Sequence, residues 1–265
     1  MNINEVLSDA DVAPFVEWFS GLASSKLSQA QTPKIKELIE RKVTHTYDAV
    51  QALIDIYQEQ DELTGVPRTL ALSAVLAHDV GRFEQALRHE SLSDCQTGID
   101  HALVSAMLFM DSDLPVSDLK VFLQAILEHN HKNSNSHSKL SCILRDTDKL
   151  ANLRQIINWL PKLIENNSER ISPSDKYVHN IRNQEVISDL GYRSLPDRVL
   201  YILSWLNDIN FMRTCELIRT ENIPRLLLQL FRQVVPENDP SFKPVEQAVN
   251  AWIGSPLLCH TETDR

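Results

Sequence analysis

Apolar residues that recur every three or four positions constrain this chain most, because that spacing builds one face of an α-helix. The pattern is clearest in the stretch from Pro33 to about residue 60, at Leu38, His45, Ala49, Ala52 and Ile56. Only six glycines occur among the 265 residues, and alternating β-branched runs are few, which disfavours sheet. The sequence therefore predicts an all-α fold, with additional helices following the main bundle.

Prolines and changes in composition predict the division of the chain. We expect a helix from about Leu140 to Leu160 that Pro161 interrupts, and the frayed end of the chain to form a tail. The expected parts are an N-terminal helical extension over 1–32, a core over 33–160, C-terminal helices packed on that core over 161–258, and a tail over 259–265.

The charge and the apolar runs exclude several classes of protein. The formal net charge is -10, whereas a general nucleic-acid binder is usually basic. The N-terminus lacks the basic and apolar regions of a signal peptide, and no apolar run approaches the ~18 residues of a membrane span. We expect a cytoplasmic protein that binds neither membranes nor nucleic acid, and negative charge at a site is also what a bound cation requires.

The histidines gather in one part of the chain, since seven of the nine lie between positions 45 and 137. At the centre, His78 and Asp79 end an apolar helix, where a buried charge needs a partner. A divalent cation accepts imidazole and carboxylate together. Neighbours on a helix point ~100° apart, so we expect Gly81 to end or bend the helix and let both reach one ion. The alternative is a capping aspartate beside a surface histidine.

Other candidate ligands have ordinary interpretations when each is taken alone. His45 lies on the inward face of its helix, where a core histidine would also lie. Asp146 and Asp148 stand at the start of an apolar segment, where they could cap a helix. His101 opens one predicted helix and His129 closes another. Their joint occurrence, in this order, favours a metal site.

The order H…HD…D, at His45, His78-Asp79 and Asp148, resembles the HD superfamily of metal-dependent phosphohydrolases. The strings AHDVGRFEQ, DHA, AILEHN and LRDTDKLANL are similar to a bacterial family of HD-domain proteins. The resemblance covers most of residues 35–230. It implies an HD-domain helical bundle that holds a metal through those four residues, with Asp146 in a capping or supporting role. No GYP-type motif follows the HD pair, so the cyclic di-guanylate subfamily is disfavoured.

The resemblance also implies how many metals the site takes. Members with two metals add two histidines between the HD pair and the last aspartate, and His101 and His129 stand there, which would make Asp79 a bridging ligand. His131 is an alternative to His129. In a one-metal site, His101 and His129 would instead bind substrate phosphate. The cofactor implied is one or two divalent ions (Mn, Fe, Mg, Ni, Co or Zn).

The activity that these residues imply is hydrolysis of a nucleotide or another small phosphoester by a metal-activated hydroxide. The expected catalytic residues are Asp79, with Arg82 and Lys149 supplying positive charge for the phosphate. The alternative for each cation is a solvated helix face. Two other functions stay open: a di-iron oxygenase, and a ligand-binding protein that keeps the site without activity. A homo-oligomer is compatible with each of these three functions.

Overall fold

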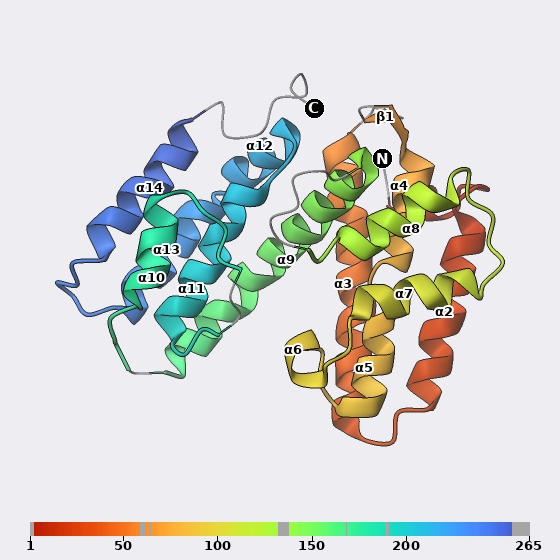
Figure 1. The fold of residues 1–265 in the computed structure, drawn as a ribbon, viewed down its shortest axis with the longest axis horizontal. Coiled ribbons are helices and arrows are strands. Elements are labelled where there is room, and N and C mark those ends of the chain that lie inside the picture. The colour runs from red at the N-terminus through yellow and green to blue at the C-terminus, as the bar shows by residue number, and fades with distance from the viewer. Residues whose placement is uncertain are drawn as a thin grey trace. The chain divides into compact units, whose positions relative to one another are not determined.

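The computed structural model describes residues 3–58, 62–63, 65–131, 138–167, 169–188 and 191–255. Within these ranges the chain forms fourteen α-helices, one short 3-10 helix and two two-residue strands, which confirms the predicted all-α fold (Figure 1). In the same ranges, no helix combines the length and apolar character that crossing a bilayer requires.

The chain divides into two compact units, 1–151 and 152–265. The elements that begin in the first unit are α1 (Ile3–Leu7), α2 (Ala13–Ser28), α3 (Pro33–Tyr57), β1 (Glu62–Leu63), β2 (Val66–Pro67), α4 (Arg68–Ala77), α5 (Gly81–His89), α6 (Asp94–Thr97), α7 (His101–Met110), α8 (Leu119–Glu128) and α9 (Lys139–Glu165). Those of the second unit are α10 (Asp175–Arg182), α11 (Leu195–Ser204), η1 (Trp205–Asp208), α12 (Met212–Thr220), α13 (Ile223–Val234) and α14 (Phe242–Gly254).

The predicted helix end at Leu160 is wrong, because α9 continues through Pro161 to Glu165. A proline inside a helix removes one hydrogen bond and costs ~3 kcal/mol. Leu160 and Ile164, one turn apart, are both buried, and burying two such side chains offsets a cost of that size. The boundary between the two compact units falls inside α9, at 151/152. Packing of the C-terminal helices on the core stays a prediction, and the tail 259–265 lies outside the described residues.

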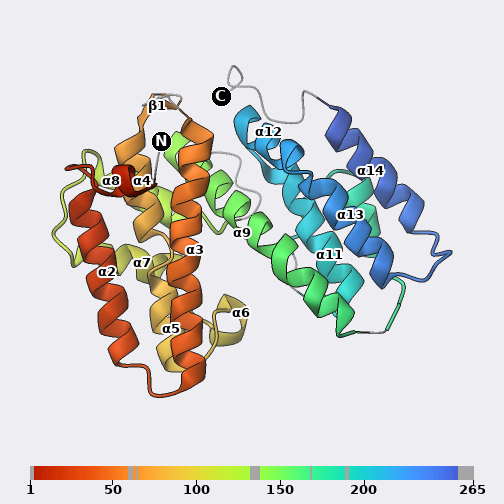
Figure 2. The same cartoon turned by 180° about the vertical axis from the view of Figure 1, so that it is seen from behind.

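Helix α3 is the longest element wholly inside the first unit, and α2, α4 and α5 all pack against it (Figure 2). The stretch predicted as an extension, 1–32, therefore contributes α2 to the same core. Helix α7 packs on α5, and α8 packs on α7 and α4. Pro33 occupies the first turn of α3, and the Thr32 side chain accepts a hydrogen bond from the Ile35 amide, so the helix begins where its sequence predicts.

The second unit is a separate helical cluster in which α11 packs against α10, α13 and η1, and α14 packs against α10 and α13. One face of α13 is buried, through Ile223, Leu227, Leu230, Phe231 and Val234. This spacing of four, three, one and three residues is the amphipathic pattern that the sequence shows.

Candidate metal centre

A turn over residues 78–80 joins α4 to α5 and places His78 and Asp79 side by side at the centre of the first unit. Both side chains are buried. The predicted break in the helix is confirmed, because α4 ends at Ala77 and α5 begins at Gly81. Within this turn, His78 (φ -61°, ψ -36°) and Val80 (φ -63°, ψ -23°) keep right-handed helical backbone angles.

Gly81 serves a different purpose from the one that the sequence suggests. A Cβ atom at this position would lie 2.2 Å from the His101 carbonyl oxygen and 2.8 Å from the Ser105 nitrogen. The Gly81 amide also donates a 2.8 Å hydrogen bond to Ser105 Oγ. Glycine is therefore required for the close approach of α5 to the start of α7, and that approach brings His101 to the site.

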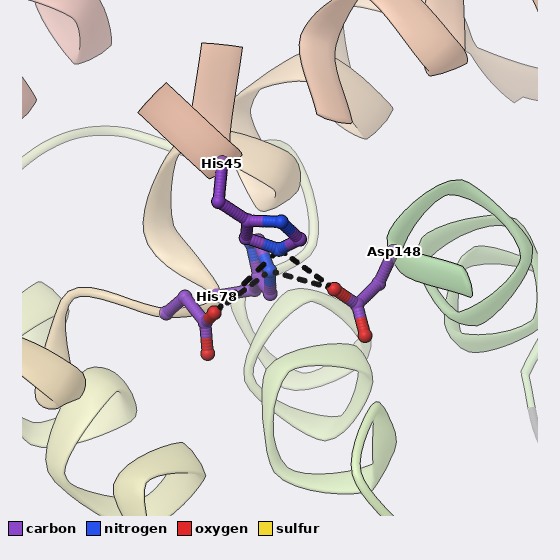
Figure 3. A group of neighbouring side chains, drawn as sticks. His45, His78 and Asp148 are labelled. Atoms are coloured by element: carbon purple, nitrogen blue, oxygen red, sulfur yellow. Dashed lines mark hydrogen bonds and ion pairs between the residues drawn. The ribbon is translucent and has the colours of Figure 1, made fainter. Parts of the chain in front are cut away.

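Four residues from three segments form the first donor group, and their donor atoms all lie within 4.8 Å of one another: His45, His78, Asp79 and Asp148. His45 from α3, His78 from the turn and Asp148 from α9 point toward one another (Figure 3). Asp148 Oδ1 lies 2.9 Å from His45 Nε2 and 3.7 Å from His78 Nε2. Asp79 Oδ2 lies 3.8 Å and 3.6 Å from the same two nitrogens.

The second donor group shares Asp79 and adds His101 and His129. Asp79 Oδ1 lies 3.2 Å from His101 Nε2 and 3.7 Å from His129 Nε2. The two oxygens of one buried carboxylate thus face two different pairs of imidazoles. This is the geometry that a bridging ligand between two cations requires.

Hydrogen bonds fix which nitrogen of three of these rings faces the centre. His78 Nδ1 lies 2.7 Å from the Val75 carbonyl, and His129 Nδ1 lies 2.6 Å from the Ile126 carbonyl. Because a carbonyl oxygen only accepts, each Nδ1 must donate, and the neutral ring then carries its lone pair on Nε2. His101 Nδ1 likewise meets Asp94 Oδ2 at 2.7 Å, the carboxylate–histidine arrangement that orients metal ligands.

Several buried nitrogen and oxygen atoms at the centre carry lone pairs that no hydrogen bond within the described part of the chain satisfies, and a cation would satisfy them. His101 Nε2 and His129 Nε2 lie 3.1 Å apart, and in these neutral tautomers neither carries a proton to share. Among the described residues, His78 Nε2 and Asp79 Oδ1 are buried without a hydrogen-bond partner. Buried polar atoms of proteins are nearly always satisfied. The donor set therefore fits one or two divalent ions bound by imidazole and carboxylate.

The ionisation of the site suits a cation. Burial alone would raise the pKa of Asp79, but the charge of Lys42 holds that pKa well below its usual value. The pKa of Asp148 is likewise held well below normal by its histidine neighbours, against the opposing effect of burial. Burial, together with His101 and His78, lowers the pKa of His129 to about 4. The site thus holds two ionised carboxylates and a neutral imidazole at His129, all forms that bind metals.

Arg82 and Lys149 are the two cations that the sequence predicts to bind phosphate. Arg82 Nη1 donates hydrogen bonds to Gln85 Oε1 (2.9 Å), the Leu92 carbonyl (2.6 Å) and Asp94 Oδ1 (2.7 Å). Its guanidinium therefore ties the segment that carries Asp94 to α5. Lys149 is half-buried on α9 beside Asp148, and its role at phosphate stays a prediction.

The structure also settles where the other candidates lie. His129 is buried in the cluster, whereas the side chain of His131 is exposed, so His129 is the histidine that reaches the site. Asp146 is fully buried on α9 but is not among the converging donors of the described chain. Arg145, buried one turn before Asp148, donates to the carbonyls of Glu128 and His131 at the end of α8.

Sequence reasoning missed Lys42, whose Nζ forms an ion pair with Asp79 Oδ2. Its signal was its place one turn before His45, on the same face of α3.

No family model matches the chain, and neither a curated protein nor a solved structure matches it. Its function must therefore be argued from the geometry of these side chains.

Proposed function

We propose that the chain is a metal-dependent phosphohydrolase of the HD type, acting on a nucleotide or another small phosphoester. The observation that carries the proposal is Asp79, whose two oxygens face the His45–His78 pair and the His101–His129 pair. Such a shared carboxylate suits two ions, and two-metal centres are common in enzymes that cleave phosphate esters.

In this proposal, the first ion is held by His45, His78, Asp79 and Asp148, and the second by Asp79, His101 and His129. When bound, the ions would lower the pKa of bound water toward neutrality and would stabilise the negative charge on a phosphoryl oxygen. Asp94 keeps the His101 ring in the tautomer that presents Nε2. Arg82 holds Asp94 in place through its hydrogen bond to Oδ1. We therefore propose that Arg82 positions Asp94 and His101, and that it does not contact the phosphate.

A second candidate is a di-iron oxygenase, because a donor set of four imidazoles and two carboxylates also suits iron. The two candidates differ in what they consume. A hydrolase needs only water, whereas an oxygenase takes up O₂ with each turnover. A protein that binds metal and ligand without turnover would show neither.

The test is metal analysis of the purified full chain, prepared with and without oxygen, followed by a panel of phosphate mono- and diesters. Chelated protein is assayed before and after addition of Mn²⁺, Mg²⁺, Co²⁺ or Ni²⁺. We expect bound divalent metal, phosphate release that chelation abolishes, and recovery with at least one ion. Oxygen uptake that tracks iron content, without phosphate release, would replace the hydrolase by the oxygenase. Absence of divalent metal under all conditions would reject both.

A further inference from the structure

Lys42 brings a positive charge to Asp79 on a long and flexible side chain. It lies on α3 one turn before His45, its side chain is 14% exposed, and Nζ pairs with Asp79 Oδ2. The other nearby cation, Arg82, has its Nε 3.6 Å from Asp79 Oδ1, but its Nη1 is held by three protein acceptors. The two cations therefore differ in their freedom to move.

The oxygen that Lys42 contacts is also a donor of the first metal group. Asp79 Oδ2 faces His45 and His78, so an ion held by these residues would take the same oxygen as the ammonium. Two cations at one carboxylate oxygen repel each other. A lysine ammonium carries three donors on a flexible four-carbon stem, so it can leave Asp79 and turn to another anion nearby.

We propose that Lys42 is the phosphate-binding residue of the metal centre. It neutralises Asp79 when metal is absent, and it contacts a non-bridging oxygen of a phosphoryl group when metal is bound. The inference rests on the proposed metal site and names the part of the ligand that Lys42 recognises. Metal bound at Asp79 displaces the Lys42 ammonium, which is then free to bind the phosphoryl group. Metal binding and phosphate binding therefore strengthen each other.

Reciprocal coupling makes the proposal measurable without any turnover, since phosphate must tighten metal binding by the same factor by which metal tightens phosphate binding. In the wild-type chain we expect saturating inorganic phosphate to tighten Mn²⁺ binding by about tenfold, within the range usual for coupled sites. In Lys42→Met, the competing ammonium is gone. That variant should bind Mn²⁺ at least as tightly as wild type without phosphate, and phosphate should tighten its Mn²⁺ binding much less than it does in wild type.

The experiment is equilibrium dialysis of the full chain against Mn²⁺, with and without inorganic phosphate, with free Mn²⁺ measured in the outer compartment. Lys42→Arg keeps the charge and should keep part of the coupling. The matched control is Lys36→Met, which should behave as wild type. It removes an exposed lysine of the same helix, whose Nζ lies 3.7 Å from Glu40 Oε1. Lys42→Gln carries the same expectation as Lys42→Met and replaces it if the methionine variant does not fold.

The outcomes separate the two proposals. If wild type binds no Mn²⁺ or other divalent ion, the metal site itself fails. If wild type binds Mn²⁺ but phosphate leaves the affinity unchanged, or if Lys42→Met and Lys42→Gln keep the full phosphate effect, the role of Lys42 is overturned and the metal site stands. A much smaller phosphate effect only in the neutral Lys42 variants supports the proposal.

Discussion

Asp79 in the first unit and Asp197 in the second are both buried, and the two carboxylates have opposite surroundings. In the second unit, Asp197 is 2% exposed and accepts hydrogen bonds from the Ser174 amide (2.7 Å) and the Ser174 hydroxyl (2.8 Å). It also stands in the first turn of α11, where the helix dipole favours negative charge. In the first unit, Asp79 is 4% exposed, and its Oδ1 has no hydrogen-bond partner among the described residues.

The contrast shows what distinguishes a carboxylate that the fold itself satisfies from one that could bind a cation. Neutral donors of its own unit satisfy both oxygens of Asp197, and nothing more is needed there. Asp79 is surrounded by imidazoles, and the hydrogen bonds made by Nδ1 leave lone pairs facing inward on His78, His101 and His129. A cation between the carboxylate and the lone pairs would satisfy both.

The largest expected difference between the two aspartates is in metal content. Asp79→Ala should lose both ions, because it removes an oxygen from each donor group, and it should stay folded. Asp197→Ala should keep the wild-type number of metal equivalents. Inductively coupled plasma analysis of both variants, with circular dichroism to check folding, measures the contrast. If folded Asp79→Ala keeps the wild-type metal content, Asp79 has only a structural role, as Asp197 does.

A second substitution tests whether Asp79 bridges. His101→Ala combined with His129→Ala removes every partner of Asp79 Oδ1 in the second group and leaves the first group intact. We expect bound metal to fall from two equivalents to one. If the double variant keeps the wild-type metal content and loses only affinity for phosphorylated ligands, the histidines bind substrate and the centre takes one ion.

A smaller effect should come from Asp94, whose Oδ2 lies 2.7 Å from His101 Nδ1 in the second group. Asp94→Asn weakens the hydrogen bond that orients the ring, and loss of such a partner typically costs roughly 10–100-fold in metal affinity. We expect this loss for the second ion alone, measured by titration with Co²⁺ and its absorption spectrum. Asp118→Asn, at the first residue before α8, is the control, since asparagine caps a helix equally well. Equal losses at both ions would argue for a general change of structure.

The smallest effect concerns stability. Asp197→Ala leaves the Ser174 amide and hydroxyl without their acceptor, and an unsatisfied buried group costs about 1–3 kcal/mol. Urea denaturation should show a loss of that size in the free energy of unfolding, equal in chelated and metal-loaded protein. A loss that appears only in metal-loaded protein would mean that the second unit takes part in the site.

Local patterns account for most of what was predictable. Helical spacing predicted the all-α fold, and the break before Gly81 was visible in the sequence. The residue types at His45, His78, Asp79 and Asp148 were enough to suggest a ligand set, because few side chains bind divalent ions. These inferences depend on short stretches of chain and on side-chain chemistry, which a sequence displays directly.

Four other features depended on neighbours that are distant in the sequence. The end of α8 turns His129 inward and leaves His131 exposed. Lys42 resembles any surface lysine until α3 packs beside the turn that carries Asp79. Arg82 is held by Leu92 and Asp94, from the segment after α5. The buried face of α9 carries the helix past Pro161. In each case the deciding energy is a contact across the fold, so only the tertiary structure determined these roles, while the sequence by itself determined the helices and the chemistry available to the site.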